Sequence, residues 1–148
     1  MRLALNDEIK KNPGYRFSAK SVAELKTCHY KLRMLFYNVI EFYDCSVLKG
    51  HRNRIDQDEA FRNGFSRKKW PNGKHNKILS EAIDVAPYNP HIGGIDWNDR
   101  EAFYHFGGFV LGVASQMGVP IRWGGDWDDD NNLHDQTFMD LAHFELVK

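Results

Sequence analysis

Two segments of the chain repeat apolar residues with helical spacing. In residues 32–43, apolar side chains stand at offsets of 3, 4, 7, 8 and 11 positions from Leu32, so they fall on one face of a helix. Between Phe103 and Met117, apolar residues recur at alternating spacings of three and four. Both patterns are typical of amphipathic helices whose apolar faces pack into a protein core.

Capping residues predict where other helices begin and end. Asn98 followed by Glu101, and Ser21 followed by Glu24, both have the spacing of a capping box. We expect the first pair to open the longer apolar helix and the second pair to open a short helix near the start of the domain. Gly118 is expected to close the longer helix, because glycine readily adopts the left-handed conformation found at helix C-termini.

Four short runs of the sequence are β-prone. They predict strands at residues 45–48, 82–87, 121–123 and 143–147. A further short helix is expected over residues 56–61, between the first two strands. Because side chains alternate along a strand, the last run places His143 and Glu145 on one face.

Length and composition favour one folded domain. The 148 residues suffice for a single core, and the lack of a sustained pattern before Phe17 predicts an N-terminal arm over residues 1–16 and a domain over residues 17–148. With 20 basic and 20 acidic residues, the net charge of zero gives no reason to expect nucleic acid or an anionic membrane as a partner. No run approaches the roughly 18 apolar residues of a membrane span, and the N-terminus lacks the apolar core of a secretory signal. We therefore expect synthesis in a cytoplasm and no membrane insertion.

The most specific chemical pattern is a set of possible metal ligands. His75 and Asp84 lie nine positions apart, and His143 lies far downstream. Two imidazoles and one carboxylate leave one zinc position open for water, which is the arrangement of a catalytic site. Asp84 also interrupts a β-prone run, against local propensity, as functional residues often do. Asp140, three residues before His143, is the natural proton acceptor.

Other polar residues complete the hypothesis. Arg52, expected at the end of a strand, could stabilise an oxyanion with its permanent charge, and Gln57 could orient the substrate. Glu145 could support His143 or contact a substrate amine. Plainer interpretations stay open at this stage, because a single His is usually structural, Arg52 could serve only in a salt bridge, and Asp140 could serve only in a turn.

Two charged runs have competing interpretations. The basic run at residues 66–70 is either a solvated loop or a rim that contacts an acidic substrate, and the first is favoured. The acidic run at residues 126–132 is rich in oxygen ligands. It lacks the ordered spacing and the glycine of an EF-hand loop, so a solvated loop is favoured over a calcium site.

A series of motifs extends over about residues 17–148. They are Gly50-His51-Arg52, Gln57, Ser66, Lys74-His75-Asn76, Ser80, residues 82–88, Ile95-Asp96-Trp97, residues 122–127 and residues 140–146. In this order they resemble the bacteriophage L-alanyl-D-glutamate endopeptidases, zinc peptidases related to D-Ala-D-Ala carboxypeptidases and to hedgehog domains. One departure is Glu81, which stands where members of this subtype often carry arginine before the second ligand.

The resemblance implies a fold, a cofactor and a site. The fold is α+β, with a small antiparallel sheet that carries a Zn²⁺ site and is flanked by helices. The metal ligands fall on His75, Asp84 and His143, and the catalytic residues on Asp140 and Arg52. On the substrate side we expect three residues, which are Gln57, Ser66 and Glu145.

The implied activity is cleavage of the L-Ala-D-Glu bond in the stem peptide of peptidoglycan by a phage or prophage lysis enzyme. Such an enzyme is expected to act as a monomer, to accumulate in the host cytoplasm and to reach periplasmic peptidoglycan once the membrane is permeabilised. The alternatives are a D-Ala-D-Ala carboxypeptidase or dipeptidase with the same zinc apparatus, or a non-catalytic, zinc-stabilised peptidoglycan-binding domain.

Overall fold

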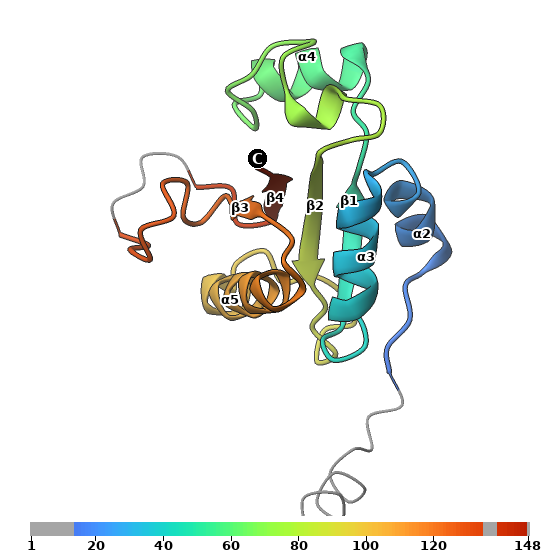
Figure 1. Cartoon of the computed structure of the whole chain (residues 1–148), viewed down its shortest axis with the longest axis vertical. Coiled ribbons are helices and arrows are strands. Elements are labelled where there is room, and N and C mark those ends of the chain that lie inside the picture. The colour runs from blue at the N-terminus through green and yellow to red at the C-terminus, as the bar shows by residue number, and fades with distance from the viewer. Residues whose placement is uncertain (1–13, 135–138, 148) are drawn as a thin grey trace, which may run out of the picture.

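The computed structural model describes residues 14–134 and 139–147, and it has the expected α+β architecture (Figure 1). A four-stranded antiparallel sheet has the order β1-β2-β4-β3, with helices packed around it. In chain order the elements are α2 (Ala19–Leu25), α3 (Tyr30–Val39), β1 (Cys45–Lys49), α4 (Arg54–Arg62), the 3-10 turn η1 (Lys74–Asn76), β2 (Ala82–Pro87), α5 (Arg100–Met117), β3 (Ile121–Trp123) and β4 (His143–Leu146). All four predicted strands and the predicted helices are therefore present.

The core lies where α3 and α5 pack against the sheet. Most helix positions selected by the apolar spacing are buried, including Phe36 on α3 and Phe106 on α5, while Tyr43, Val113 and Met117 are partly buried. Both rings meet Phe144 of β4 edge-on, with ring centroids 5.6 and 6.1 Å away. β4 is thereby fixed by aromatic packing on one face, which leaves its other face for polar side chains.

Strand register places two predicted ligands side by side. β4 pairs with β2 so that His143 lies opposite Asp84 and Glu145 lies opposite Ala82. Because alternate residues of a strand share a face, His143 and Glu145 point away from the Phe144 side. The sheet thus carries the two ligands on neighbouring strands.

Two helix starts differ from the sequence prediction. Ser18, not Ser21, caps α2 by accepting a hydrogen bond from the Ser21 backbone N–H at 3.1 Å. Ser21 is buried inside the helix, where its hydroxyl accepts from the Val47 backbone N–H at 3.0 Å. At α5 the cap is Asp99 rather than Asn98. A cap is defined by which side chain reaches the free backbone N–H groups, and the Ser/Asn-x-x-Glu spacing does not determine that reach.

Between β1 and β2 the chain forms a protruding segment, residues 51–80, which we call the α4–η1 lobe. Figure 1 shows α4 beyond the end of the sheet at which β2 begins. The expected short helix is α4, and Gly64 follows it in the left-handed conformation at φ 77°. The lobe therefore lies at the end of the sheet where the chain passes from η1 into β2.

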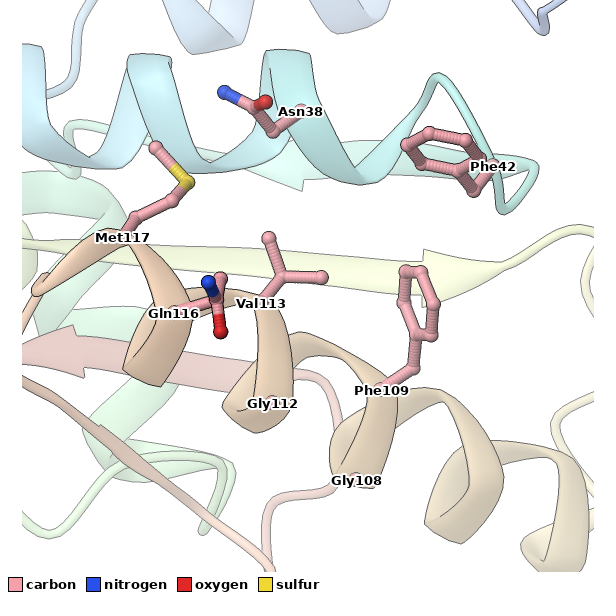
Figure 2. A pocket seen from close by; sticks show the side chains of 8 residues that line it. All are labelled: Asn38, Phe42, Gly108, Phe109, Gly112, Val113, Gln116 and Met117. Carbon is pink, nitrogen blue, oxygen red and sulfur yellow. The ribbon is translucent and has the colours of Figure 1, made fainter. Parts of the chain in front are cut away.

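Other features of the fold lie apart from the predicted site. A groove of about 430 Å³ separates α3 from α5, and Figure 2 shows Phe42 facing Phe109 and Val113 across it. The predicted arm falls mostly on residues 1–13, which lie outside the described residues, while the Tyr15 backbone N–H already bonds to the Ile40 carbonyl. Across the described residues, no helix is both long and apolar enough to cross a membrane.

Candidate metal centre and active site

Three side chains from distant parts of the sequence converge on one point. His75 comes from η1, Asp84 from β2 and His143 from β4. His75 Nε2 lies 3.2 Å from Asp84 Oδ1 and 3.3 Å from His143 Nδ1, and His143 Nδ1 lies 3.3 Å from Asp84 Oδ1. The three predicted ligands therefore form a nearly equilateral triangle of donor atoms.

The size of this triangle fits a small tetrahedral metal ion. Bonds of about 2.0–2.1 Å to such an ion place neighbouring donors roughly 3.3–3.4 Å apart. The observed separations of 3.2 to 3.3 Å agree with that spacing. The group could thus bind a metal ion without rearrangement.

Each histidine is oriented by its second ring nitrogen. The Gly50 carbonyl can only accept, so His75 Nδ1 donates to it at 2.7 Å, and in the neutral ring the lone pair then lies on Nε2, which faces Asp84 and His143. His143 has the opposite arrangement, with Nε2 against Glu145 Oε1 at 2.8 Å and Nδ1 facing the other donors. Such partners fix the tautomer of a metal ligand and increase its basicity.

Glu145 is held by cations as well as by His143. Its Oε2 lies 3.5 Å from Lys74 Nζ and 3.8 Å from Arg122 Nη1. Burial raises the pKa of Glu145, but the bond and charge of His143 and the charge of Lys74 outweigh it and lower that pKa. Glu145 is consequently ionised and engaged with His143, which corresponds to the supporting role of the two predicted for it.

Hydrogen bonds and charges among the donors shift the pKa values of His143 and Asp84 when no metal is bound. Burial alone lowers the pKa of His143, but hydrogen bonds to Asp84 and Glu145 and the charges of Asp84 and Asp140 raise it to about 9. Burial raises the pKa of Asp84, whereas the charge of His75 and hydrogen bonds from both histidines bring it well below its usual range. A proton on His143 therefore offsets the charge of Asp84, and a metal ion that bound here would displace it.

Asp140 lies beside this triangle without belonging to it. Its Oδ2 is 4.0 Å from His143 Nδ1, and its side chain keeps 32% of its exposure. Burial, followed by the charge of Asp84, raises the pKa of Asp140 to about 6 against the opposing charges of His143, His75 and Arg52. This carboxylate can exchange protons near neutrality.

A close backbone contact fixes Asp140. Its N–H donates to the Gly124 carbonyl at 3.0 Å, and a Cβ at Gly124 would collide with the Asp140 carbonyl. In the sequence, Gly124 was identified only within the motif of residues 122–127, because a contact between two loops leaves no periodic signal.

Arg52 also reaches the donor group. Its Nη2 lies 3.4 Å from Asp84 Oδ2, and its Nη1 donates to Gln57 Oε1 at 3.1 Å. Its backbone N–H donates to the carbonyl of His75 at 2.8 Å. The predicted catalytic arginine is therefore within the site and held at both ends.

Gln57 is fully buried and uses both ends of its amide. Besides Arg52, its Oε1 accepts from Asn76 Nδ2 at 3.1 Å. Its Nε2 donates to the Ser66 hydroxyl at 3.0 Å and to the Lys68 carbonyl at 2.6 Å. Of the residues expected on the substrate side, Gln57 and Ser66 are thus bonded to each other within the lobe.

Asn76 was missed as a site residue, although it follows His75 directly. It is 7% exposed, and its Nδ2 also donates to the Arg52 carbonyl at 3.0 Å. A buried asparagine next to a candidate ligand was the available signal. The partners of its Nδ2, however, are 19 and 24 positions away and follow only from the tertiary fold.

Three aspartates of the acidic run lie close to one another. Asp126, Asp128 and Asp130 each offer a carboxylate oxygen within 4.8 Å of the others, close enough for a cation to bridge them. Asp126 is buried and accepts backbone N–H bonds from Asp130 at 3.3 Å and Asn131 at 2.9 Å. Trp127, between these aspartates, lies with its ring 5.3 Å from that of His143, so the run borders the metal centre.

A family model described as phage L-alanyl-D-glutamate peptidase matches residues 13–147 of the chain. The chain belongs to this family. It is 32% identical over 139 residues to the L-alanyl-D-glutamate peptidase of Escherichia phage T5, a match that covers 90% of this chain and 99% of the phage T5 protein. All predicted site residues of this family member lie within the matched region.

A solved structure supports the fold independently. The L-Ala D-Glu endopeptidase ChiX of Serratia marcescens superposes with a TM-score of 0.67, covering 91% of this chain and 92% of that one. At 24% identity, this likeness establishes that the two proteins share the fold.

Proposed function

We propose that this protein is a zinc peptidase that hydrolyses the L-Ala-D-Glu bond of peptidoglycan stem peptides during phage lysis. The observation that carries the proposal is the triangle of His75, Asp84 and His143, with donor separations of 3.2 to 3.3 Å, in a member of the L-alanyl-D-glutamate peptidase family. Two neutral imidazoles and a carboxylate are the donor set of many catalytic zinc sites. When bound there, zinc supplies Lewis acidity towards water and the scissile carbonyl.

Asp140 is the proposed general base and acid. Its carboxylate, 4.0 Å from the donor triangle, is close enough to remove a proton from the attacking water. The same group can then deliver that proton to the departing amine. A pKa near neutrality suits both steps, because the group must hold and release the proton in one cycle.

Arg52 is the proposed electrostatic partner of the scissile carbonyl. Its guanidinium is permanently charged and lies beside Asp84, so it can stabilise negative charge that develops on the substrate oxygen. Gln57 then acts as a positioning residue, in place of the direct substrate contact expected from the sequence. Its full burial and its bond to Arg52 support that role.

Ser66 and Glu145 also act through other residues in this proposal. Ser66 anchors the loop after α4 by accepting from Gln57 Nε2. Glu145 fixes the tautomer of His143. Substrate recognition is left to Arg52 and to the exposed rim around the metal centre.

The first experiment is mass spectrometry of fragments released from purified Gram-negative sacculi by zinc-loaded protein, with a chelator-treated control. We expect peptides that begin at D-glutamate, and we expect the chelator to abolish them. Release of terminal D-Ala alone would replace the proposal by a carboxypeptidase. No release from folded, zinc-loaded protein would favour a non-catalytic peptidoglycan-binding domain.

A second experiment separates catalysis from metal binding. Asp140→Ala is expected to keep one zinc per chain and to lose at least about 10²-fold in turnover, which is the usual contribution of a general base. Full activity in this variant would contradict the proposed mechanism.

We further propose that the enzyme works as a monomer and meets periplasmic peptidoglycan only after the host membrane has been opened.

A further inference from the structure

The α4–η1 lobe is strongly basic although the whole chain is neutral. Residues 51–80 contain eight Lys and Arg against three Asp and Glu, a net charge of +5 with histidines neutral. The rest of the chain has twelve basic and seventeen acidic residues, a net charge of −5. Charge balance over the full sequence therefore conceals a polarised molecule, and the sequence-level argument against an anionic partner does not apply to the lobe.

Several of these cations are available to a partner. Arg62, Lys68 and Lys77 are exposed, and within residues 14–134 and 139–147 none of them lies within 4.0 Å of a carboxylate. Lys69 is exposed as well and stands over the ring of Phe61 at 5.1 Å. Cations that are not neutralised by the fold retain their attraction for external anions.

In the sequence of the lobe, exposed apolar residues are interspersed among these cations. Ile55, Phe65 and Ile78 retain 74%, 71% and 89% of their exposure. Large apolar residues exposed together on one segment often mark an interaction surface. The lobe thus presents a mixed cationic and apolar surface, which is suited to an anionic chain that also carries methyl groups.

This surface is joined directly to the metal centre. The Lys68 carbonyl accepts from Gln57 Nε2, while Oε1 of the same glutamine holds Arg52 next to Asp84. At the other end of the lobe, the Lys77 carbonyl lies 3.0 Å from His51 Nδ1, one residue before Arg52. A polymer bound to the lobe consequently passes beside the site that cleaves it.

We propose that the exposed cations of the α4–η1 lobe bind the carboxylates of peptidoglycan stem peptides that neighbour the one being cleaved. The inference rests on the proposed function. The D-glutamyl residue next to the scissile bond is itself acidic, and a cross-linked polymer presents such carboxylates at every repeat. Many weak contacts to one insoluble polymer add up through effective concentration, so the lobe keeps the enzyme on the network between cuts.

The test compares two triple variants of the full chain with the same charge change. The lobe variant is Arg62→Gln, Lys68→Gln and Lys77→Gln. The control is Arg16→Gln, Lys20→Gln and Lys26→Gln, which removes one arginine and two lysines that are also exposed, on α2 and next to its ends. Binding is measured by co-sedimentation with purified sacculi at low salt, with Asp140→Ala added to every protein so that the polymer stays intact. Turnover of a small soluble muropeptide is measured with Asp140 present.

We expect the lobe variant to bind sacculi about tenfold more weakly than the control, with unchanged turnover of the soluble muropeptide. The difference should vanish near 0.5 M salt, where the screening length falls to about 4 Å. Equal binding by the two variants would overturn the inference, and so would a lobe variant that loses binding only to vesicles of anionic lipid. A wild-type protein that does not cleave the muropeptide but shows the lobe-dependent binding would refute the proposed function and retain the docking surface.

Discussion

The sheet and the α4–η1 lobe bring ligands to the same metal centre by different means. Asp84 and His143 are placed by strand register, and the strand that carries His143 is fixed by the buried Phe144. His75 is placed by polar contacts, because its ring donates to the Gly50 carbonyl and its backbone carbonyl accepts from Arg52. Strand register and apolar packing therefore position Asp84 and His143, whereas a hydrogen-bond network positions His75.

The two means of placement differ in what disturbs them. Register tolerates changes in single polar side chains, since backbone bonds and Phe144 maintain it. The contacts of the lobe depend on a single side chain, because the Gln57 amide connects Arg52, Asn76 and the loop after α4. Substitutions of the donors and of their partners on the sheet should therefore act on metal binding, whereas substitutions that break the Gln57 network of the lobe should act on turnover.

The largest expected effect follows removal of a donor from the sheet. His143→Ala should lose bound zinc and at least about 10³-fold in kcat/KM, because the ion contributes several kcal/mol to the barrier. Metal content by mass spectrometry and turnover of a soluble muropeptide check this. His91→Ala, at an exposed turn, is the matched control and should retain both. A His143→Ala protein that kept one zinc and full activity would remove the donor triangle from the mechanism.

The protonation of His143 makes the stability of the metal-free protein depend on pH. A pKa raised from 6.5 to about 9 stabilises the fold by about 3 kcal/mol below pH 6.5, and this contribution is lost as the pH rises through 9. We expect the Tm of chelated protein to fall by several degrees between pH 6.5 and 9.5. Asp140 titrates near 6 and so lies below this window. Zinc-loaded protein should not show this decrease, because the metal excludes the proton; the same decrease with and without zinc would contradict the prediction.

A smaller effect is expected when the lobe network is broken. Gln57→Leu leaves Arg52, Asn76 and the Lys68 carbonyl without their partner, and kcat should fall about 100-fold while zinc content stays near one per chain. Gln57→Glu keeps an acceptor for Arg52 and should recover much of kcat. A rise in KM alone in Gln57→Leu would indicate direct substrate contact instead of positioning.

The smallest effect concerns the carboxylate that orients His143. Glu145→Gln retains the shape of the side chain but removes the charge, so zinc affinity should weaken about tenfold. Competition with a chromophoric chelator measures this affinity. Lys20→Gln, on the surface of α2, provides a charge-change control. Unchanged affinity in Glu145→Gln would mean that the backbone alone holds the His143 ring.

Periodicity was sufficient to predict the parts of the fold that depend on apolar burial. Spacing and residue type predicted the helical faces led by Leu32 and Phe103 and the strand that contains Asp84. These elements leave a periodic pattern in the sequence because each one must turn one apolar face to the core. The helix caps were misplaced because a cap depends on the reach of one side chain rather than on a repeat.

The sequence predicted which residues form the site but not which of them contact one another. Chemistry and the family resemblance selected His75, Asp84 and His143, yet the pairing of Asp84 with His143 arises from contact between strands that are not consecutive in the chain. Gln57 was selected for substrate contact, and its burial within the lobe became visible only in the fold. Networks among distant polar residues leave no periodic trace, so sequence patterns do not reveal them.

The position of β4 has a consequence for synthesis. β4 is the last strand in chain order but lies between β2 and β3 in the sheet, so it has to enter between two strands that were made before it. A ribosome-bound chain that stops before His143 already contains His75 and Asp84 but lacks the third donor. In the proposed mechanism, the ability to cut peptide bonds therefore appears only after translation has passed the final strand, which brings His143. The order of synthesis would thereby keep nascent chains inactive.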